Sequence, residues 1–313
     1  MNEMGDLVNF PQSAKQLREL GLQAFRNGNF TQAVQHLDQL CHQFPDSVTP
    51  GDVRTLAGAY LQLDELDEAA DTVRDASDDL VQDANGRYLL LQIATRQPDF
   101  PLGAYVINAT TDPTEHEDNL MTMTQTMADY DETHAHEVAV TKRHLRHLGG
   151  MTVLEQERFI TTELARLPFN DVVDPLSAAL VDRDVHPAVR SSLVTWARVA
   201  VPTTPFPVWV YDRLVTITPA ELDMPVEDAT SQAVLGAIVD QLPEQEDMLE
   251  SVLPTFYVLL GFLYPAVPEI ITDTDEFARA ALNPQRESAY SGLIEWLLAA
   301  AQQLNDAGTS LDQ

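Results

Sequence analysis

The apolar residues near the N-terminus follow a pattern that recurs about 36 residues further on, and this repeat restricts the possible folds more than any other feature. The first copy consists of Leu17, Leu20, Gly21, Ala24, Phe25, Gly28, Phe30 and Ala33, and it closes at Pro45. The second copy consists of Leu56, Ala57, Ala59, Tyr60, Leu66 and Ala69. A period of this length indicates stacked helical hairpins. Such stacks bind other chains far more often than they catalyse reactions, so the repeat favours a binding function.

Three windows of the N-terminal part resemble tetratricopeptide (TPR) repeats. The windows are residues 14–47, 50–83 and 84–117. The first matches most signature positions, although Leu17 stands where the family usually has Trp and Ala24 where it usually has Tyr. In the third, Pro98 and Pro101 crowd the turn, so we expect that hairpin to be degenerate. The resemblance implies a right-handed α-solenoid of TPR hairpins over residues 1–117.

A unit within residues 151–201 is similar to a HEAT repeat, which is a pair of helices joined by a turn. Asp174 followed by Pro175 predicts the start of its first helix. The resemblance implies that Asp182 and Arg190 help to fix the turn between the two helices. We therefore expect HEAT-like helices after the TPR block.

The C-terminal region changes character before it returns to helical periodicity. The runs 208–211 and 214–217 are rich in β-branched and aromatic residues and are separated by Asp212-Arg213, which predicts a short β-hairpin. Helices are expected at 228–241, 245–264, 274–282 and 287–305. The predicted fold is all-α, with a TPR domain at 1–117, connecting helices at 118–150, HEAT-like helices at 151–201, and the β-hairpin with further helices at 202–313. The whole chain resembles uncharacterised bacterial cytoplasmic TPR proteins.

The composition limits the partners and the compartment. The net charge of −31, from 49 acids against 18 bases, disfavours nucleic acid and anionic membranes as partners. The longest apolar run, 256–264, is too short to span a bilayer. The single Cys41 excludes an internal disulfide and fits a reducing compartment, and residues 1–6 lack the apolar core of a secretory signal. These features predict a cytoplasmic protein.

Motifs for catalysis and cofactor binding are missing from the sequence. It has no Gly-rich phosphate loop, no HExxH, no CxxC and no GxSxG. We therefore expect no enzyme, no catalytic residue, no metal and no cofactor. Several histidines do fall in one region, namely His116, His134, His136, His144 and His147. A metal-binding protein or enzyme that uses them is an alternative, although a solvated helix with scattered histidines is favoured.

The TPR resemblance also assigns a binding face, because the first helix of each hairpin lines a concave groove in that family. The residues that map to this groove are Lys15, Arg18, Leu22, Phe25, Arg26, Arg54, Leu61, Tyr88, Gln92 and Arg96. Arginine binds carboxylates through paired hydrogen bonds, and Phe25 and Tyr88 would add apolar contacts. We therefore expect a basic groove in an acidic protein. The alternative is that these arginines only pair with neighbouring acids.

These observations predict a non-enzymatic interaction or scaffold protein that binds a segment of another protein, one with acidic groups, in the TPR groove. A peptide-sensing regulator that couples such repeats to DNA binding is a weaker alternative, since the TPR block leaves no room for a basic helix-turn-helix in front of it. The β-hairpin with Trp209 and the apolar 256–264 helix either cap the solenoid, which we favour, or allow self-association.

Overall fold

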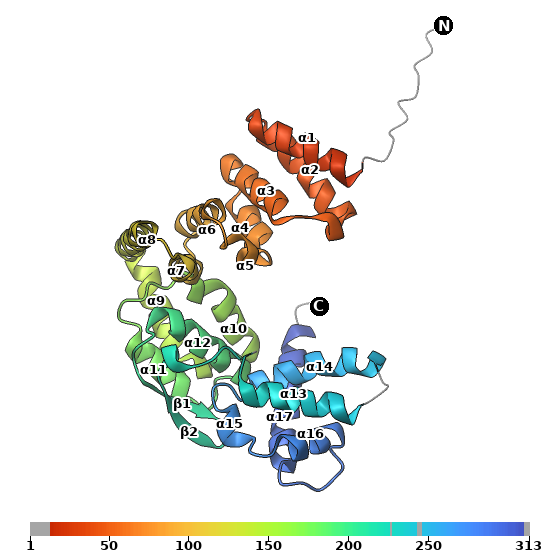
Figure 1. Cartoon of the computed structure of the whole chain (residues 1–313). Helices are drawn as coiled ribbons and strands as arrows, with labels where there is room; N and C mark the ends of the chain where they lie inside the picture. The colour runs from red at the N-terminus through yellow and green to blue at the C-terminus, as the bar shows by residue number, and fades with distance from the viewer. Residues whose placement is uncertain (1–12, 226, 243–245, 310–313) are drawn as a thin grey trace. The chain divides into compact units, whose positions relative to one another are not determined.

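The computed structural model describes residues 13–225, 227–242 and 246–309, and helices dominate it (Figure 1). Residues 1–6, in which we expected no signal, and Gln245, where we expected a helix to begin, lie outside the described residues. The chain divides into two compact units, 1–126 and 127–313, which are described separately. The finer division into four regions stays a prediction.

The first unit consists of helical hairpins that follow one another along the chain (Figure 1). Its helices are α1 Ala14–Arg26, α2 Phe30–Gln43, α3 Pro50–Leu63, α4 Leu66–Arg74, α5 Ser77–Leu80, α6 Ala84–Arg96 and α7 Phe100–Ala109, and α8 Pro113–Thr133 crosses the boundary between the units. The pairs α1–α2, α3–α4 and α6–α7 pack together, so the expected hairpins form. Small residues permit this packing: a Cβ at Gly21 would lie 2.6 Å from Cγ of Leu37.

Polar caps and prolines begin these helices where the sequence places them. Ser13 and Gln16 form a capping box at α1, in which each side chain bonds the other residue's backbone N–H. The third window, which we expected to be a degenerate repeat because of Pro98 and Pro101, forms the hairpin α6–α7. Asp99 caps α7, and Pro101 sits in its first turn, where the helix does not use the missing N–H.

The second hairpin departs from the regular pattern because its second helix is short. α4 ends at Arg74, and the four-residue α5 follows. Asp75 lies at the C-cap of α4, where a negative charge opposes the helix dipole, whereas Asp78 and Asp79 lie in the first turn of α5, where it is favourable. A Cβ at Gly86 of α6 would lie only 1.9 Å from the carbonyl oxygen of Leu80, so glycine is needed for α5 to pack on α6.

The second unit is helical apart from one two-stranded sheet. Its helices are α9 Ala135–Arg146, α10 Val153–Arg158, α11 Val173–Val181, α12 Pro187–Ala200, α13 Ala229–Gln241, α14 Glu246–Gly261, α15 Val267–Ile270, α16 Thr274–Leu282 and α17 Ser291–Thr309. A π-helical turn, η3 Phe159–Glu163, continues α10, and single 3-10 turns lie at η1 Pro45–Ser47, η2 Leu148–Gly150, η4 Leu164–Arg166 and η5 Pro219–Glu221. Buried apolar residues from Val138 to Ala300 form one continuous core.

The segment that resembles a HEAT repeat forms the helices α11 and α12, and Arg190 of α12 bonds the turn between them. Its Nη2 donates to the main-chain oxygens of Asp182, at 2.6 Å, and Val185, at 2.7 Å. The carboxylate of Asp182 accepts a bond from the N–H of Asp184 in the same turn. The predicted start of α11 at Pro175 is wrong by two residues: the helix begins at Val173, and Asp174 pairs with Arg146 instead of capping.

The predicted β-hairpin is confirmed as β1 Phe206–Val210 and β2 Arg213–Ile217, paired antiparallel. The turn is displaced by one residue from the prediction. Val210 faces Arg213 in the register, so Tyr211 and Asp212 form the loop, and Tyr211 adopts a left-handed φ of 53°. Within the ranges that the structure describes, none of the helices combines the length and the apolar character needed to cross a membrane.

Candidate functional site

The predicted groove residues lie on the first helices of the three hairpins. α1 carries Lys15, Arg18, Leu22, Phe25 and Arg26, α3 carries Arg54 and Leu61, and α6 carries Tyr88, Gln92 and Arg96. α3 contacts both α1 and α6, so the three helices follow one another along one side of the first unit (Figure 1). A Cβ at Gly58 of α3 would lie 3.4 Å from the ring of Phe25, which shows how closely α1 and α3 approach.

Arg18, Arg54 and Arg96 of this face form ion pairs with acids that lie about 30 residues away along the chain. Nε of Arg18 donates to both carboxylate oxygens of Asp52, at 2.8 and 2.9 Å. Arg54 of α3 pairs with Asp83, which caps α6, at 2.8 Å. Each pair therefore connects one hairpin to the next.

Arg96 makes the equivalent contact in the opposite direction along the chain. Its Nη2 lies 2.6 Å from the carboxylate of Asp64, and its Nη1 donates to the carbonyl oxygen of Leu61 at 2.9 Å. Asp64 occupies the C-cap of α3 in a left-handed conformation, with φ 62°. Arg18, Arg54 and Arg96 thus support the stacking of the hairpins, and their charges are balanced by neighbouring carboxylates.

Asp52 is the most strongly buried acid of these pairs, with an exposed fraction of 2%. Burial by itself would raise its pKa, but the hydrogen bonds from Arg18 and from the hydroxyl and N–H of Thr49 outweigh that effect and lower the pKa. Asp52 is therefore ionised at neutral pH. It also completes the capping box of α3 with Thr49.

Sequence reasoning missed the partners of the arginines, although a local signal existed for two of them. Thr49 and Asp52 have the spacing of a capping box, and Asp83 precedes a helix as a cap. Capping places a carboxylate at a known point beside the next helix. Asp64, by contrast, follows the end of a helix and carries no comparable signal.

The other residues of the face differ in how far their side chains are exposed to solvent. Tyr88 is 66% exposed, which is unusual for an aromatic side chain on a packed helix. Arg26 and Lys15 are exposed, and Lys15 lies 3.9 Å from Glu19 in a solvent-exposed pair that contributes little to stability. Leu61 is buried, so its side chain belongs to the interior rather than to the accessible surface.

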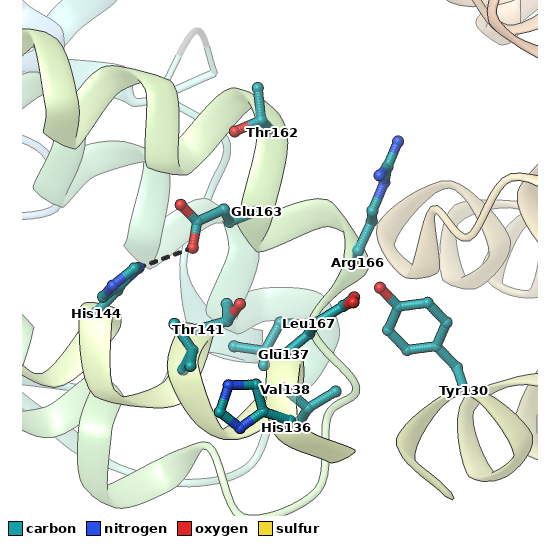
Figure 2. Close-up of a pocket in the computed structure, with 11 residues that line it drawn as sticks. Tyr130, His136, Glu137, Val138, Thr141, His144, Thr162, Glu163, Arg166 and Leu167 are labelled. Atoms are coloured by element: carbon teal, nitrogen blue, oxygen red, sulfur yellow. Dashed lines mark hydrogen bonds and ion pairs between the residues drawn. The ribbon is translucent and has the colours of Figure 1, made fainter. Parts of the chain in front are cut away.

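The histidine region contains a cavity of about 450 Å³ in the second unit (Figure 2). Its walls are formed by Tyr130, His136, Glu137, Val138, Val140, Thr141, His144, Thr162, Glu163, Arg166 and Leu167. Nδ1 of His144 lies 3.0 Å from the carboxylate of Glu163, which stands in the π-helical turn (Figure 2). Burial, together with the charge of Glu137, raises the pKa of Tyr130.

The histidines are not gathered into a metal site. His116 bonds the carbonyl oxygen of Ile107, and His134 stacks on Tyr130 with ring centroids 4.2 Å apart. Across the part of the chain that the structure describes, no three His, Cys, Asp or Glu side chains are placed to hold a metal ion.

The comparison with protein families agrees with the geometry of the first unit. Residues 24–93, which run from α1 into α6, match the sequence model of the tetratricopeptide repeat. The N-terminal region is a TPR region. Neither a curated protein nor a solved structure matches the chain. TPR repeats generally mediate protein–protein interactions and are typically non-enzymatic, so the match supports a binding role for this region.

Proposed function

We propose that the TPR region binds a segment of another protein on the face formed by α1, α3 and α6, and that the chain acts as a non-enzymatic interaction protein. The observation that carries the proposal is the exposed ring of Tyr88 on α6. Aromatic side chains of this kind are enriched among the residues that dominate binding energy. Half-buried Leu22, Phe25 and Gln92 on the same helices add apolar area and hydrogen-bonding capacity.

The partner segment carries acidic groups in this proposal, and the charge that attracts them comes from Lys15 and Arg26. The other arginines of the face already bond carboxylates of this chain. An acidic segment would have to compete with those bonds, whereas Lys15 and Arg26 are exposed at the two ends of α1. Recognition therefore rests on apolar contact at Tyr88 first and on charge second.

The test is capture of a partner by the full chain from native lysate, followed by titration calorimetry with the captured partner's purified binding segment. Tyr88→Ala should weaken that binding about 30-fold, because truncation of a central aromatic typically costs about 2 kcal/mol. The matched control is Tyr257→Ala, which removes a ring that is 45% exposed in the second unit. Equal affinity of the two variants would refute the binding face.

The acidic character of the partner is tested separately. Arg26→Glu should weaken the same segment and reduce the salt dependence of binding, while Arg158→Glu, an exposed change in α10, should do neither. Substitution of Arg18, Arg54 or Arg96 is unsuitable for this purpose, because it would break the pairs that connect the hairpins. An unchanged affinity and salt dependence of Arg26→Glu would rule out an acidic partner at this end of α1.

A further inference from the structure

A second cavity of the second unit, of about 300 Å³, lies where segments remote in sequence meet. These segments are the turn between α11 and α12, the tip of the β-hairpin, and α17, with Val153 of α10 beside them. Two of the three tryptophans of the chain, Trp209 and Trp296, line this cavity together with Tyr211. The rings of Tyr211 and Trp296 contact each other at a centroid distance of 5.3 Å and an angle of 59°. All three rings are only half-buried, so they form the walls of an accessible space.

Two arginines line the same cavity, which is notable in a chain with a net charge of −31. The guanidinium carbon of Arg183 lies 3.7 Å from the ring centroid of Trp209. Stacking of this kind uses the flat face of the guanidinium and leaves the N–H groups on its edge available to an acceptor. Arg183 itself is exposed at the cavity and needs no movement to meet a ligand.

Arg190 is the second cation, and it is 3% exposed. Its Nη2 bonds the carbonyl oxygens of Asp182 and Val185, but its Nε finds no hydrogen-bond partner within the described residues. A buried donor without a partner is costly, and a charged one more so. Burial lowers the pKa of Arg190 to about 10, so the side chain still carries its charge at neutral pH.

The buried histidine of the lining does not compete for the same role. His186 is buried and uses both ring nitrogens, because Nε2 lies 3.0 Å from the carbonyl oxygen of Ala300 and Nδ1 accepts from the N–H of Ala188. Asp184 is the acidic residue of the lining, so the lining itself carries two arginines against one carboxylate, and the charge of Asp182 also acts on Arg190.

We propose that this cavity binds a small organic anion, in which a carboxylate or phosphate group meets Arg183 and Arg190 while a planar apolar body contacts the Trp209, Tyr211 and Trp296 rings. The volume is at the lower end of the range of ligand sites and fits a molecule built on a single ring. Charge-assisted hydrogen bonds fix the anionic group, and the aromatic walls select a planar body. This site does not depend on the TPR face.

The test uses the full chain labelled with nitrogen-15 and follows the indole N–H signals of the tryptophans by NMR during titration. The probes are phenylacetate, phenyl phosphate and the uncharged phenylacetamide. Phenylacetate or phenyl phosphate should shift the signals of Trp209 and Trp296 saturably and leave the signal of Trp196 in place. The probe with the lower dissociation constant shows whether the site prefers a carboxylate or a phosphate. Phenylacetamide should bind at least about tenfold more weakly, because it lacks the charge that the arginines bond.

Substitution of Arg183 tests whether this residue binds the anionic probes. Arg183→Gln should raise the dissociation constant at least about tenfold. The control Arg213→Gln changes an arginine of the β-hairpin that pairs with Asp212 and lies outside the cavity lining, and it should leave the dissociation constant unchanged. Arg183 is preferred to Arg190 for this purpose, because Arg190 also holds its turn together. The proposal is overturned if neither anion shifts Trp209 and Trp296, if phenylacetamide binds equally well, or if Arg183→Gln binds as tightly as the unaltered chain.

Discussion

Asp52→Asn tests whether the arginines of the first unit connect its hairpins. The substitution removes the charge that Arg18 bonds from 2.8 and 2.9 Å, and it leaves a neutral side chain of the same shape. Removing one member of a buried ion pair costs about 3–5 kcal/mol. Arg18 is 28% exposed, so water recovers part of this loss, and Asn keeps an oxygen for Thr49. We expect the free energy of unfolding of the first unit to fall by about 2 kcal/mol at pH 7.

Amide hydrogen exchange in the full chain is the appropriate assay, because two compact units do not yield one unfolding transition. A loss of about 2 kcal/mol should accelerate exchange of the protected amides in residues 14–63 about 30-fold. The control is Asp71→Asn, which removes an exposed pair with Arg74 and should cost less than about 0.5 kcal/mol. The reasoning is refuted if the two variants exchange equally.

The destabilisation caused by Asp52→Asn should depend on pH. The pKa of Asp52 is lowered in the folded chain, so its contribution is fully present above its ordinary value of 3.8 and is lost as the pH falls through the folded value. The difference between the unaltered chain and Asp52→Asn should therefore be constant near neutral pH and shrink in acid. A difference that grew as the pH fell would contradict the assigned direction.

Two further predictions concern glycine packing and a buried histidine. Gly86→Ala should destabilise the first unit by about 2 kcal/mol, because the new Cβ would meet the carbonyl oxygen of Leu80 at 1.9 Å. Gly58→Ala should be neutral or stabilising, since the new Cβ meets only the tip of the Phe25 ring. Amide hydrogen exchange of the first unit in the full chain separates the two variants. Burial lowers the pKa of His186, so the neutral ring stabilises the second unit fully above the unfolded value of 6.5, and this contribution declines as the pH falls below it. His186→Gln should flatten the decline of the second unit's opening free energy below pH 6.5, as measured by amide hydrogen exchange in the full chain. An unchanged decline would count against this role of the ring.

The repeat pattern of the sequence was enough to predict the hairpins of the first unit, because helix formation and close packing follow local spacing. Gly21 against Leu37 is such a case: the two residues lie on consecutive helices, and only glycine allows the approach. The β-hairpin was predicted on the same basis, and its turn is displaced by one residue, because Tyr211 lies in the turn and not in the first strand. The position of Tyr88 on the first helix of its hairpin also followed from the repeat.

Tertiary structure decided what the charged residues do. The repeat placed Arg18, Arg54 and Arg96 on one face, and the expected basic groove followed from that placement alone. Their carboxylate partners lie about 30 residues away, and an ion pair depends on the distance in space between two helix ends, which local periodicity does not encode. The cavity with Trp209 and Arg183 was beyond sequence reasoning for the same reason, because its walls come from three segments that only folding brings together.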